Sequence, residues 1–444
     1  MSEIAKLPAA ELVRRYRRKD LSPVEVTKAA LSRIDACNKA VNAFCVIDAD
    51  QALASAAASE ARWMKGEPCG LVDGVPTTIK DVVLTKGWPT LRGSRTTDPD
   101  QPWDIDAPCT ARLREHGAVL LGKTTTPEFG WKGVTDNLVS GITRNPWNTD
   151  RTPGGSSGGA AAAAALGMGA LHIGTDGGGS IRIPSGFTGV FGHKPSFGRV
   201  PAWPGSAFGT LSHVGPLTRT VTDAALMLNV ITQPDARDWT ALPFRERDYT
   251  IGLEDGVAGL RIAYSPVLGY VDVDPEIAAL VRAAAEVMRD LGATIEKVDP
   301  GFNDPAETFR RQWARRSPSV NFWMLSKRAI NWAKRCRSST KHTTCCSHRR
   351  CPFLLSRQAK RSLARTASRD GRFGLRLRSR STLPSNLSLQ HHAVSRVKDC
   401  PPVSKSLAQS MPMRWSCVPR VPTSPLVHSG CRTNRTCNID GLER

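Results

Sequence analysis

Two glycine-rich segments on either side of a run of small residues constrain the fold of this chain more than any other feature. Residues 154–159 have the sequence GGSSGG and residues 174–180 have GTDGGGS, while residues 160–169 contain only alanine, leucine, methionine and glycine. The run predicts a helix that packs tightly against its neighbours, because its side chains are small. The glycines allow the backbone to adopt shapes that a Cβ would block. Ser156 and Ser180 thus lie 24 residues apart in the sequence, each among glycines.

These glycines have two simpler interpretations, a flexible linker and a phosphate-binding loop. A flexible Gly/Ser linker would not continue into an apolar helix and then an Ile-rich segment. A phosphate-binding loop would need a pattern such as GxxxxGK[ST], which neither glycine-rich segment contains. Each glycine motif taken singly is weak evidence, so its interpretation depends on the other motifs of the chain, above all on Lys80.

The charge of the chain changes abruptly along its length. The formal net charge is +21, but residues 1–316 contain 36 Lys and Arg against 36 Asp and Glu. Residues 317–444 contain 25 basic and 4 acidic residues, together with eight of the twelve cysteines. The basic character therefore describes only the last part, and we predict a domain over 1–316 and a basic, Cys/Arg/Ser-rich, poorly ordered segment over 317–444.

The first part has the periodicity of alternating helices and strands. Apolar spacing predicts helices within 11–34, with a turn at 21–23, and over 52–63, and it predicts a buried strand over 118–123. A strand at 259–264, a helix at 275–291 and a strand at 294–298 follow and form a βαβ unit. This alternation predicts an α/β protein. We expect a cytoplasmic location, because no run of 18 apolar residues and no apolar leader stretch is present.

Three interpretations compete for residues 317–444. A disordered tail that binds nucleic acid is poorly compatible with eight cysteines and several large apolar residues. A zinc module could use Cys345, Cys346, His348 and Cys351, but their spacing matches no CxxC…CxxC framework. The third interpretation, which we favour, is translation in a shifted reading frame that begins near residues 313–318.

A serine that acts as a nucleophile needs a base to activate its hydroxyl, and donors for the negative charge that develops on the group it attacks. Lys80 follows the apolar, strand-like stretch 74–79, and burial there would lower its pKa enough for it to act as a base. The alternative is an ordinary surface lysine beside Asp81. The histidines of the first part are predicted to be structural; they are His116, His172, His193 and His213.

These motifs together resemble the amidase signature family of serine hydrolases. The resemblance covers roughly 1–316 and extends to the segments 21–26 (LSPVEV), 42–44 (NAF), 74–81 (GVPTTIKD), 127–130 (PEFG), 143–148 (TRNPWN), 191–196 (FGHKPS) and 215–223 (GPLTRTVTD). It implies a single α/β/α domain with a mixed central β-sheet covered by helices on both faces. It also implies Lys80 as base, Ser156 after a cis peptide bond as proton relay, and Ser180 as the nucleophile that forms an acyl-enzyme.

Further residues receive supporting roles. Consecutive backbone N–H groups without a Cβ obstruction suit an oxyanion hole, predicted at Gly177, Gly178, Gly179 and Ser180. We expect Asp176 and Arg182 to pair across this loop, and Ser157 to hydrogen bond to Ser156. The resemblance places Gly130 near the acyl-binding cavity. It also marks Gly177 as a departure, because many relatives have a bulkier residue there.

The function implied is hydrolysis of a carboxamide to a carboxylic acid and ammonia. Alternatives are an indole-3-acetamide hydrolase, an A-type component of glutamyl-tRNA amidotransferase, and an inactive frameshifted product. The resemblance implies a small-molecule amide as substrate and neither a metal nor an organic cofactor. We expect no nucleic-acid or membrane partner, and a homodimer is one assembly that the sequence leaves open.

The shifted-frame hypothesis can be examined from codons alone. When the frame starts at the third base of each codon, permitted GC-rich codons for residues 413–428 can encode AVVLRPTCPDVPAGA. This sequence is similar to a late strand and loop of the amidase signature family. In the same offset, residues 318–332 can encode a helix of balanced charge. The hypothesis implies that the final elements of the family fold are replaced in this chain.

Overall fold

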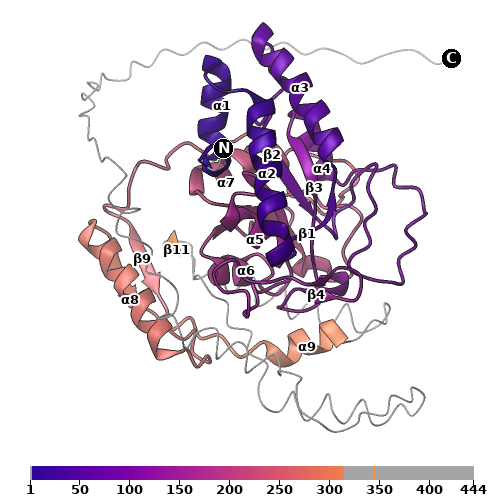
Figure 1. Ribbon diagram of the computed structural model, residues 1–444. Helices are drawn as coiled ribbons and strands as arrows, with labels where there is room; N and C mark the ends of the chain where they lie inside the picture. Colours follow the sequence, from indigo (N-terminus) through magenta and orange to yellow (C-terminus); the bar gives the residue numbers. More distant parts are fainter. Residues whose placement is uncertain (1–2, 315–343, 346–444) are drawn as a thin grey trace, which may run out of the picture. The chain divides into compact units, whose positions relative to one another are not determined.

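The computed structural model of the chain describes residues 3–314 and 344–345 (Figure 1). The chain divides into two units, Met1–Cys400 and Pro401–Arg444, and every described residue lies in the first. The description below concerns this unit alone.

Several sequence-based predictions concern residues outside the described ranges. The boundary expected between residues 316 and 317 lies there, as do three members of the suggested zinc cluster, Cys346, His348 and Cys351. The division into two parts, the poor order expected of 317–444 and the shifted reading frame therefore stay predictions.

A mixed six-stranded sheet forms the centre of the fold, with the order β1-β3-β2-β6-β8-β7. Its strands are β1 (Phe44–Ile47), β2 (Pro76–Lys80), β3 (Val119–Thr124), β6 (Leu171–Asp176), β7 (Phe191–Gly192) and β8 (His213–Thr218). The three central strands β3, β2 and β6 run parallel, while β1, β8 and β7 pair antiparallel to their neighbours. The prediction of a mixed central sheet is confirmed.

Helices cover both faces of this sheet. They are α1 (Ala9–Arg18), α2 (Pro23–Val41), α3 (Ala49–Lys65), α4 (Pro108–Glu115), α5 (Gly158–Leu166), α6 (Arg182–Thr188) and α7 (Val221–Ile231). One apolar cluster joins α2, α3 and α5 to Val119 and Leu121 of β3, and another joins α1, α4 and α7 to Leu120. Because strand side chains alternate in direction, these clusters lie on opposite faces of the sheet. The α/β/α architecture expected from the sequence is therefore present.

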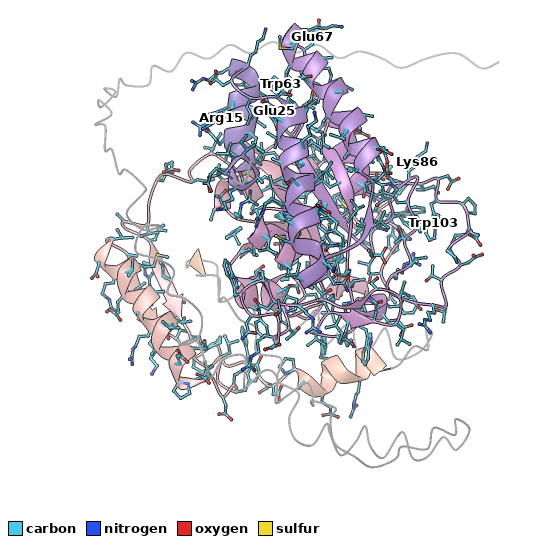
Figure 2. All side chains as sticks on the ribbon, viewed as in Figure 1. Arg15, Glu25, Trp63, Glu67, Lys86 and Trp103 are labelled. Carbon is cyan, nitrogen blue, oxygen red and sulfur yellow. The ribbon has the colours of Figure 1, made fainter. Side chains whose placement is uncertain are left out.

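The N-terminal helices have clear local causes. Ser22 caps α2 in a capping box with Glu25, and Pro23 occupies the first helical turn. Helices α1, α2 and α3 stand side by side in indigo in Figure 1. Trp63 of α3, labelled in Figure 2, is 5% exposed, and its ring centroid lies 6.1 Å from that of Tyr16 in α1. Aromatic packing thus joins α1 to α3.

Helix α5 occupies a site that only small residues can fill. Its first seven residues, Gly158–Ala164, are all buried. A Cβ at Gly158 would collide with Thr135 Oγ1, and one at Gly159 would collide with Thr125 Oγ1. The closely packed helix predicted from residues 160–169 is confirmed, and its N-terminus directly follows Ser156 and Ser157.

The predicted βαβ unit is also present. It consists of β9 (Arg261–Tyr264), α8 (Pro275–Asp290) and β10 (Thr294–Lys297). Together with β11 (Thr344–Cys345) it forms a parallel three-stranded sheet of its own, in the order β10-β9-β11. The remaining described elements are the short pair β4 (Asp136–Asn137) and β5 (Gly141–Ile142), the helix α9 (Ala306–Ala314) and the 3-10 turns η1 (Ile4–Lys6), η2 (Glu128–Gly130) and η3 (Gly209–Leu211).

Candidate active site

Lys80 is the last residue of β2, a strand in which every residue is buried. Its ammonium nitrogen Nζ lies 2.7 Å from Ser156 Oγ, 2.9 Å from Ser157 Oγ and 2.9 Å from Thr175 Oγ1. The side chain is completely buried, so the alternative of a surface lysine is wrong. The centre of the sheet thus delivers one amine to a cluster of three hydroxyl groups.

Burial controls the protonation of this amine. Removal from water disfavours the charged ammonium and lowers the pKa of Lys80 from 10.5 to about 7, and the negative charge of Asp176 opposes this shift. A lysine with a pKa near neutrality is present partly as the free amine under physiological conditions. The site can therefore supply a base.

Ser156 lies in the loop before α5 and is 1% exposed. The peptide bond between Gly155 and Ser156 is cis, which confirms the expectation from the resemblance. A Cβ at Gly155 would lie 2.6 Å from the carbonyl carbon of Val134. Glycine is required at this position because the backbone of the neighbouring segment approaches so closely.

Ser180 follows the three glycines at the end of the loop after β6 and is 7% exposed. Its carbonyl oxygen accepts a hydrogen bond of 3.1 Å from the backbone N–H of Ser157. This bond ties the loop of Ser180 to the loop of Ser156. The two serine-bearing segments that are separate in the sequence are therefore neighbours in the fold.

The oxyanion-hole prediction needs one correction. The N–H of Gly179 donates a 2.8 Å hydrogen bond to Asp176 Oδ1, so this group is already used within the loop. Gly179 has a φ of 118°, a conformation that favours glycine. Among the four predicted donors, the backbone N–H groups of Gly177, Gly178 and Ser180 stay candidates for the oxyanion hole. A glycine run does not reveal which of its amides a nearby carboxylate will bind.

Asp176 organises this loop through its carboxylate. Arg182 donates from Nε and Nη2 to the two carboxylate oxygens, each at 2.9 Å, which confirms the predicted pair. Burial alone would raise the pKa of Asp176, but the hydrogen bonds from Arg182 and from backbone amides lower it to about 2. The carboxylate is thus permanently charged near neutral pH and holds the turn around Gly179 in one shape.

The sequence analysis missed Thr175 and assigned Ser157 a different contact. We expected Ser157 to hydrogen bond to Ser156, but the structure places its Oγ on Lys80 Nζ and within 3.2 Å of the backbone N–H and C=O of Thr175. Strand β6 brings Thr175 Oγ1 to the same amine. The one sequence signal was the position of Thr175 directly before the Asp176 turn, and it did not indicate the direction of the side chain.

Gly130 lies beside Ser156. A Cβ at Gly130 would be 3.4 Å from Ser156 Oγ and 3.7 Å from Val82 Cγ1, and the residue has a φ of 68°. Gly130 is thus a neighbour of the Ser156 hydroxyl, while its place beside an acyl-binding cavity stays a prediction.

The histidines make structural contacts. His172 Nδ1 lies 2.8 Å from Thr78 Oγ1, and burial lowers the pKa of this imidazole to about 3. His116 Nδ1 accepts from the backbone N–H of Leu71, and His213 Nδ1 lies 3.0 Å from the carbonyl oxygen of Asp176. These contacts agree with the structural roles predicted for them.

Within residues 3–314 and 344–345, no group of His, Cys, Asp and Glu residues is arranged to hold a metal ion. Among the same residues, no helix combines the length and the apolar character needed to cross a bilayer.

Sequence similarity relates the chain to known amide-processing proteins. The model of the Amidase family matches residues 25–344. The chain is 41% identical over 303 residues to an acylamidase of Rhodococcus erythropolis, which covers 68% of this chain and 63% of that protein. It is also 41% identical over 280 residues to the A component of the glutamyl-tRNA(Gln) amidotransferase of Chloroflexus aurantiacus, which covers 63% of this chain and 57% of that one. The chain therefore spans less than two thirds of the length of either relative.

Solved structures give the same picture. The fold is similar to that of a bacterial aryl acylamidase of the amidase signature family, with a TM-score of 0.66 and 35% identity over 82% of this chain and 73% of that chain. It is also similar to native peptide amidase from Stenotrophomonas maltophilia, with a TM-score of 0.62 and 30% identity over 69% of this chain and 64% of that chain.

Proposed function

Because the chain belongs to the amidase signature family, we propose that it hydrolyses a carboxamide to a carboxylic acid and ammonia. The observation behind this proposal is the 2.7 Å contact between Lys80 Nζ and Ser156 Oγ, in surroundings that lower the pKa of Lys80 to about 7. A neutral amine in contact with a serine hydroxyl is the arrangement that serine activation requires.

In the proposed mechanism, neutral Lys80 accepts the proton of Ser156. Ser156 accepts the proton of Ser180 while Ser180 Oγ attacks the carbonyl carbon of the amide. The C–N bond then breaks, and the departing amine receives the proton back from Lys80 through Ser156. A water molecule next attacks the acyl-enzyme, loses its proton along the same path, and releases the acid and free Ser180.

The loop after β6 would stabilise the transition state. Negative charge develops on the carbonyl oxygen during attack, and the backbone N–H groups of Gly177, Gly178 and Ser180 would donate to it. Asp176 and Arg182 would hold these donors in place, and Ser157 and Thr175 would orient the amine of Lys80. Gly130 would leave room for the acyl group next to Ser156.

The decisive experiment removes the nucleophile. Ser180→Ala should abolish hydrolysis of acetamide, benzamide and indole-3-acetamide, and it should also abolish covalent labelling by a fluorophosphonate. Ser185→Ala is a matched control, because Ser185 lies shortly after Ser180 in α6 and its hydroxyl donates to the backbone of Ile181. The control should retain activity and labelling. Hydrolysis that persists in Ser180→Ala would contradict the proposal.

A second candidate function follows from the similarity to the A component of an amidotransferase. The same catalytic triad of Lys80, Ser156 and Ser180 could release ammonia from glutamine within a larger complex. The purified chain should then hydrolyse glutamine poorly alone and well with its partner proteins. An acylamidase would hydrolyse aryl or alkyl amides without them, so the two functions separate in one assay. An indole-3-acetamide hydrolase would instead show a marked preference for that amide over benzamide.

Assembly and location stay predictions. A homodimer and a complex with other proteins differ in mass, and light scattering on the purified chain distinguishes them. Cell fractionation tests the cytoplasmic location expected from the sequence.

A further inference from the structure

A second buried lysine lies one strand away from Lys80. Lys123 of β3 is 0% exposed and is opposite Ile79 of β2 in the strand register, whereas Lys80 is opposite Thr124. Because neighbouring positions of a strand point to opposite faces of the sheet, Lys123 projects away from the face that carries the hydroxyl cluster. The proposed mechanism makes no use of this lysine.

Lys123 and Asp81 form a buried ion pair that is hydrogen bonded to one loop. Lys123 Nζ lies 3.1 Å from Asp81 Oδ1, and it donates to the carbonyl oxygen of Pro89 and to Thr90 Oγ1. Asp81 Oδ2 accepts a 3.2 Å hydrogen bond from the backbone N–H of Gly93. The pair is thus bonded to both ends of the loop 89–93.

The same loop holds the segment that borders Ser156. The carbonyl oxygen of Arg92 accepts a 2.7 Å hydrogen bond from the backbone N–H of Phe129. The next residue is Gly130, whose missing Cβ would lie 3.4 Å from Ser156 Oγ. A continuous series of contacts therefore leads from the ion pair, through loop 89–93, to the acyl side of the serine relay.

The charges of the pair suit a fixed arrangement. Burial raises the pKa of Asp81 and lowers that of Lys123, and in each case the opposite charge of the partner counteracts the shift. Removing one partner would leave the other buried without compensation, which is strongly destabilising.

We propose that Lys123 and Asp81 are positioning residues, which fix loop 89–93 and thereby hold Gly130 at the distance from Ser156 that an acyl group requires. This inference rests on the proposed function. It assigns a task to two buried charges on the sheet face opposite the triad. Neither residue would touch the substrate.

The main test compares Lys123→Met with Lys132→Met in the full chain. Lys132 is the control, because it makes an ion pair of 2.7 Å with Asp136 on a nearby segment while its side chain is 26% exposed. We expect Lys123→Met to raise KM for benzamide roughly tenfold or more, with a smaller change in kcat, because small displacements near a reacting group are costly. Lys132→Met should leave both constants unchanged.

Amide hydrogen exchange gives a second readout that does not need activity. Lys123→Met should accelerate exchange at 89–93 and at 128–131, where the N–H groups of Gly93 and Phe129 are hydrogen bonded. Exchange in α5 should stay slow. Unchanged exchange in both segments, or a lowered stability with unchanged KM, would overturn the positioning role.

A milder variant guards against simple misfolding. Thr90→Val keeps the ion pair but removes one loop contact of Lys123. It should shift KM and exchange in the same direction as Lys123→Met, by a smaller factor. If the unmodified chain hydrolyses no amide while exchange responds as expected, the proposed function fails, and only the anchoring of loop 89–93 and of the segment around Gly130 by the ion pair stands. If the chain hydrolyses amides while exchange and KM stay unchanged in both variants, the positioning role fails and the proposed function stands.

Discussion

At the scale of single residues, the burial of Lys80 determines both the chemistry and its energetic cost. A pKa of about 7 instead of 10.5 corresponds to roughly 5 kcal/mol of lost stability at low pH, because each unit is about 1.4 kcal/mol. The three hydroxyl contacts of Nζ keep the amine in place despite this cost. The fold thus gives up stability to hold a neutral amine beside Ser156.

The first prediction concerns the pH dependence of catalysis. The base form of Lys80 is needed, so kcat/KM should rise with pH and level off above an apparent pKa of about 7. Asp176, with a pKa of about 2, should contribute no step between pH 5 and 9. Initial rates on benzamide across this range measure the profile. A rate that falls as pH rises through 7 would exclude Lys80 as the base.

The second prediction concerns stability. Below pH 7 both the folded and the unfolded chain bind the Lys80 proton, so the cost of burying the charge is fully present. Between pH 7 and 10.5 only the unfolded chain binds it, so stability rises with pH. Lys80→Met should therefore abolish activity and stabilise the chain more at pH 6.5 than at pH 9.5. Urea unfolding of both proteins at the two pH values gives this difference, and the exposed Lys39→Met is the control. An equal effect at both values would contradict the argument.

The third prediction concerns Thr175. A neutral lysine has two N–H groups and one lone pair; if the lone pair faces Ser156, the N–H groups can donate to Ser157 and Thr175. Thr175→Val would leave one buried N–H unpaired, at a cost of about 1–3 kcal/mol, so we expect kcat/KM to fall about tenfold or more. Thr175→Ser keeps the hydroxyl and should restore most of the rate. Equal rates in the two variants would show that the hydroxyl is not used.

At the scale of elements, α9 places an aromatic ring against the glycine loop 177–180. A Cβ at Gly178 would lie 2.6 Å from Cζ of Phe309, so the ring edge fills the space beside this glycine. An added methyl group must displace either the ring or the loop. Displacement of the loop would affect catalysis more than displacement of the ring, because the amides of the loop are the proposed oxyanion donors.

The fourth prediction follows from this contact. Gly178→Ala should lower kcat by roughly the 10²–10³-fold typical of a lost oxyanion donor. Gly205→Ala is a matched control, because a Cβ there would meet nothing within 4 Å. Phe309→Ala combined with Gly178→Ala should recover part of the rate, which a double-mutant cycle measures. A double variant as slow as Gly178→Ala would place the defect in the loop backbone rather than at the ring.

The same elements show what a sequence can and cannot predict. Helix α2 was predictable because Ser22 and Glu25 cap it locally, and the βαβ unit was predictable because its apolar spacing is regular. The engagement of Gly179 by Asp176 and the burial of Lys123 were not predictable from local signals. Both depend on which strands lie side by side, and this is decided by packing between distant segments. Glycine motifs located the loops but left their hydrogen bonds undetermined.

At the scale of the whole molecule, helix α8, near the end of the charge-balanced residues 1–316, has an exposed apolar side. On α8, the side chains of Leu280, Val287 and Leu291 at its end are 55%, 55% and 59% exposed. Full burial of one such side chain is worth about 1.5–3 kcal/mol. The relatives extend well beyond the matched region, since the chain spans 63% and 57% of two of them. We expect that a shifted reading frame after about residue 316 has replaced a segment that would cover this side.

The fifth prediction tests that hypothesis on the gene and on the protein. Resequencing codons 300–444 should reveal a missing or extra base, and the frame-corrected chain should unfold at a higher temperature and hydrolyse amides faster than the uncorrected chain. Leu280→Glu should then destabilise the corrected chain by about 2 kcal/mol or more, because a charge would enter a covered apolar surface. The same substitution should leave the melting temperature of the uncorrected chain nearly unchanged, because the side chain is already 55% exposed. An unbroken frame with an active product would instead mean that the basic segment belongs to the protein. If the frame is broken, equal effects of Leu280→Glu in the corrected and uncorrected chains would mean that α8 stays uncovered.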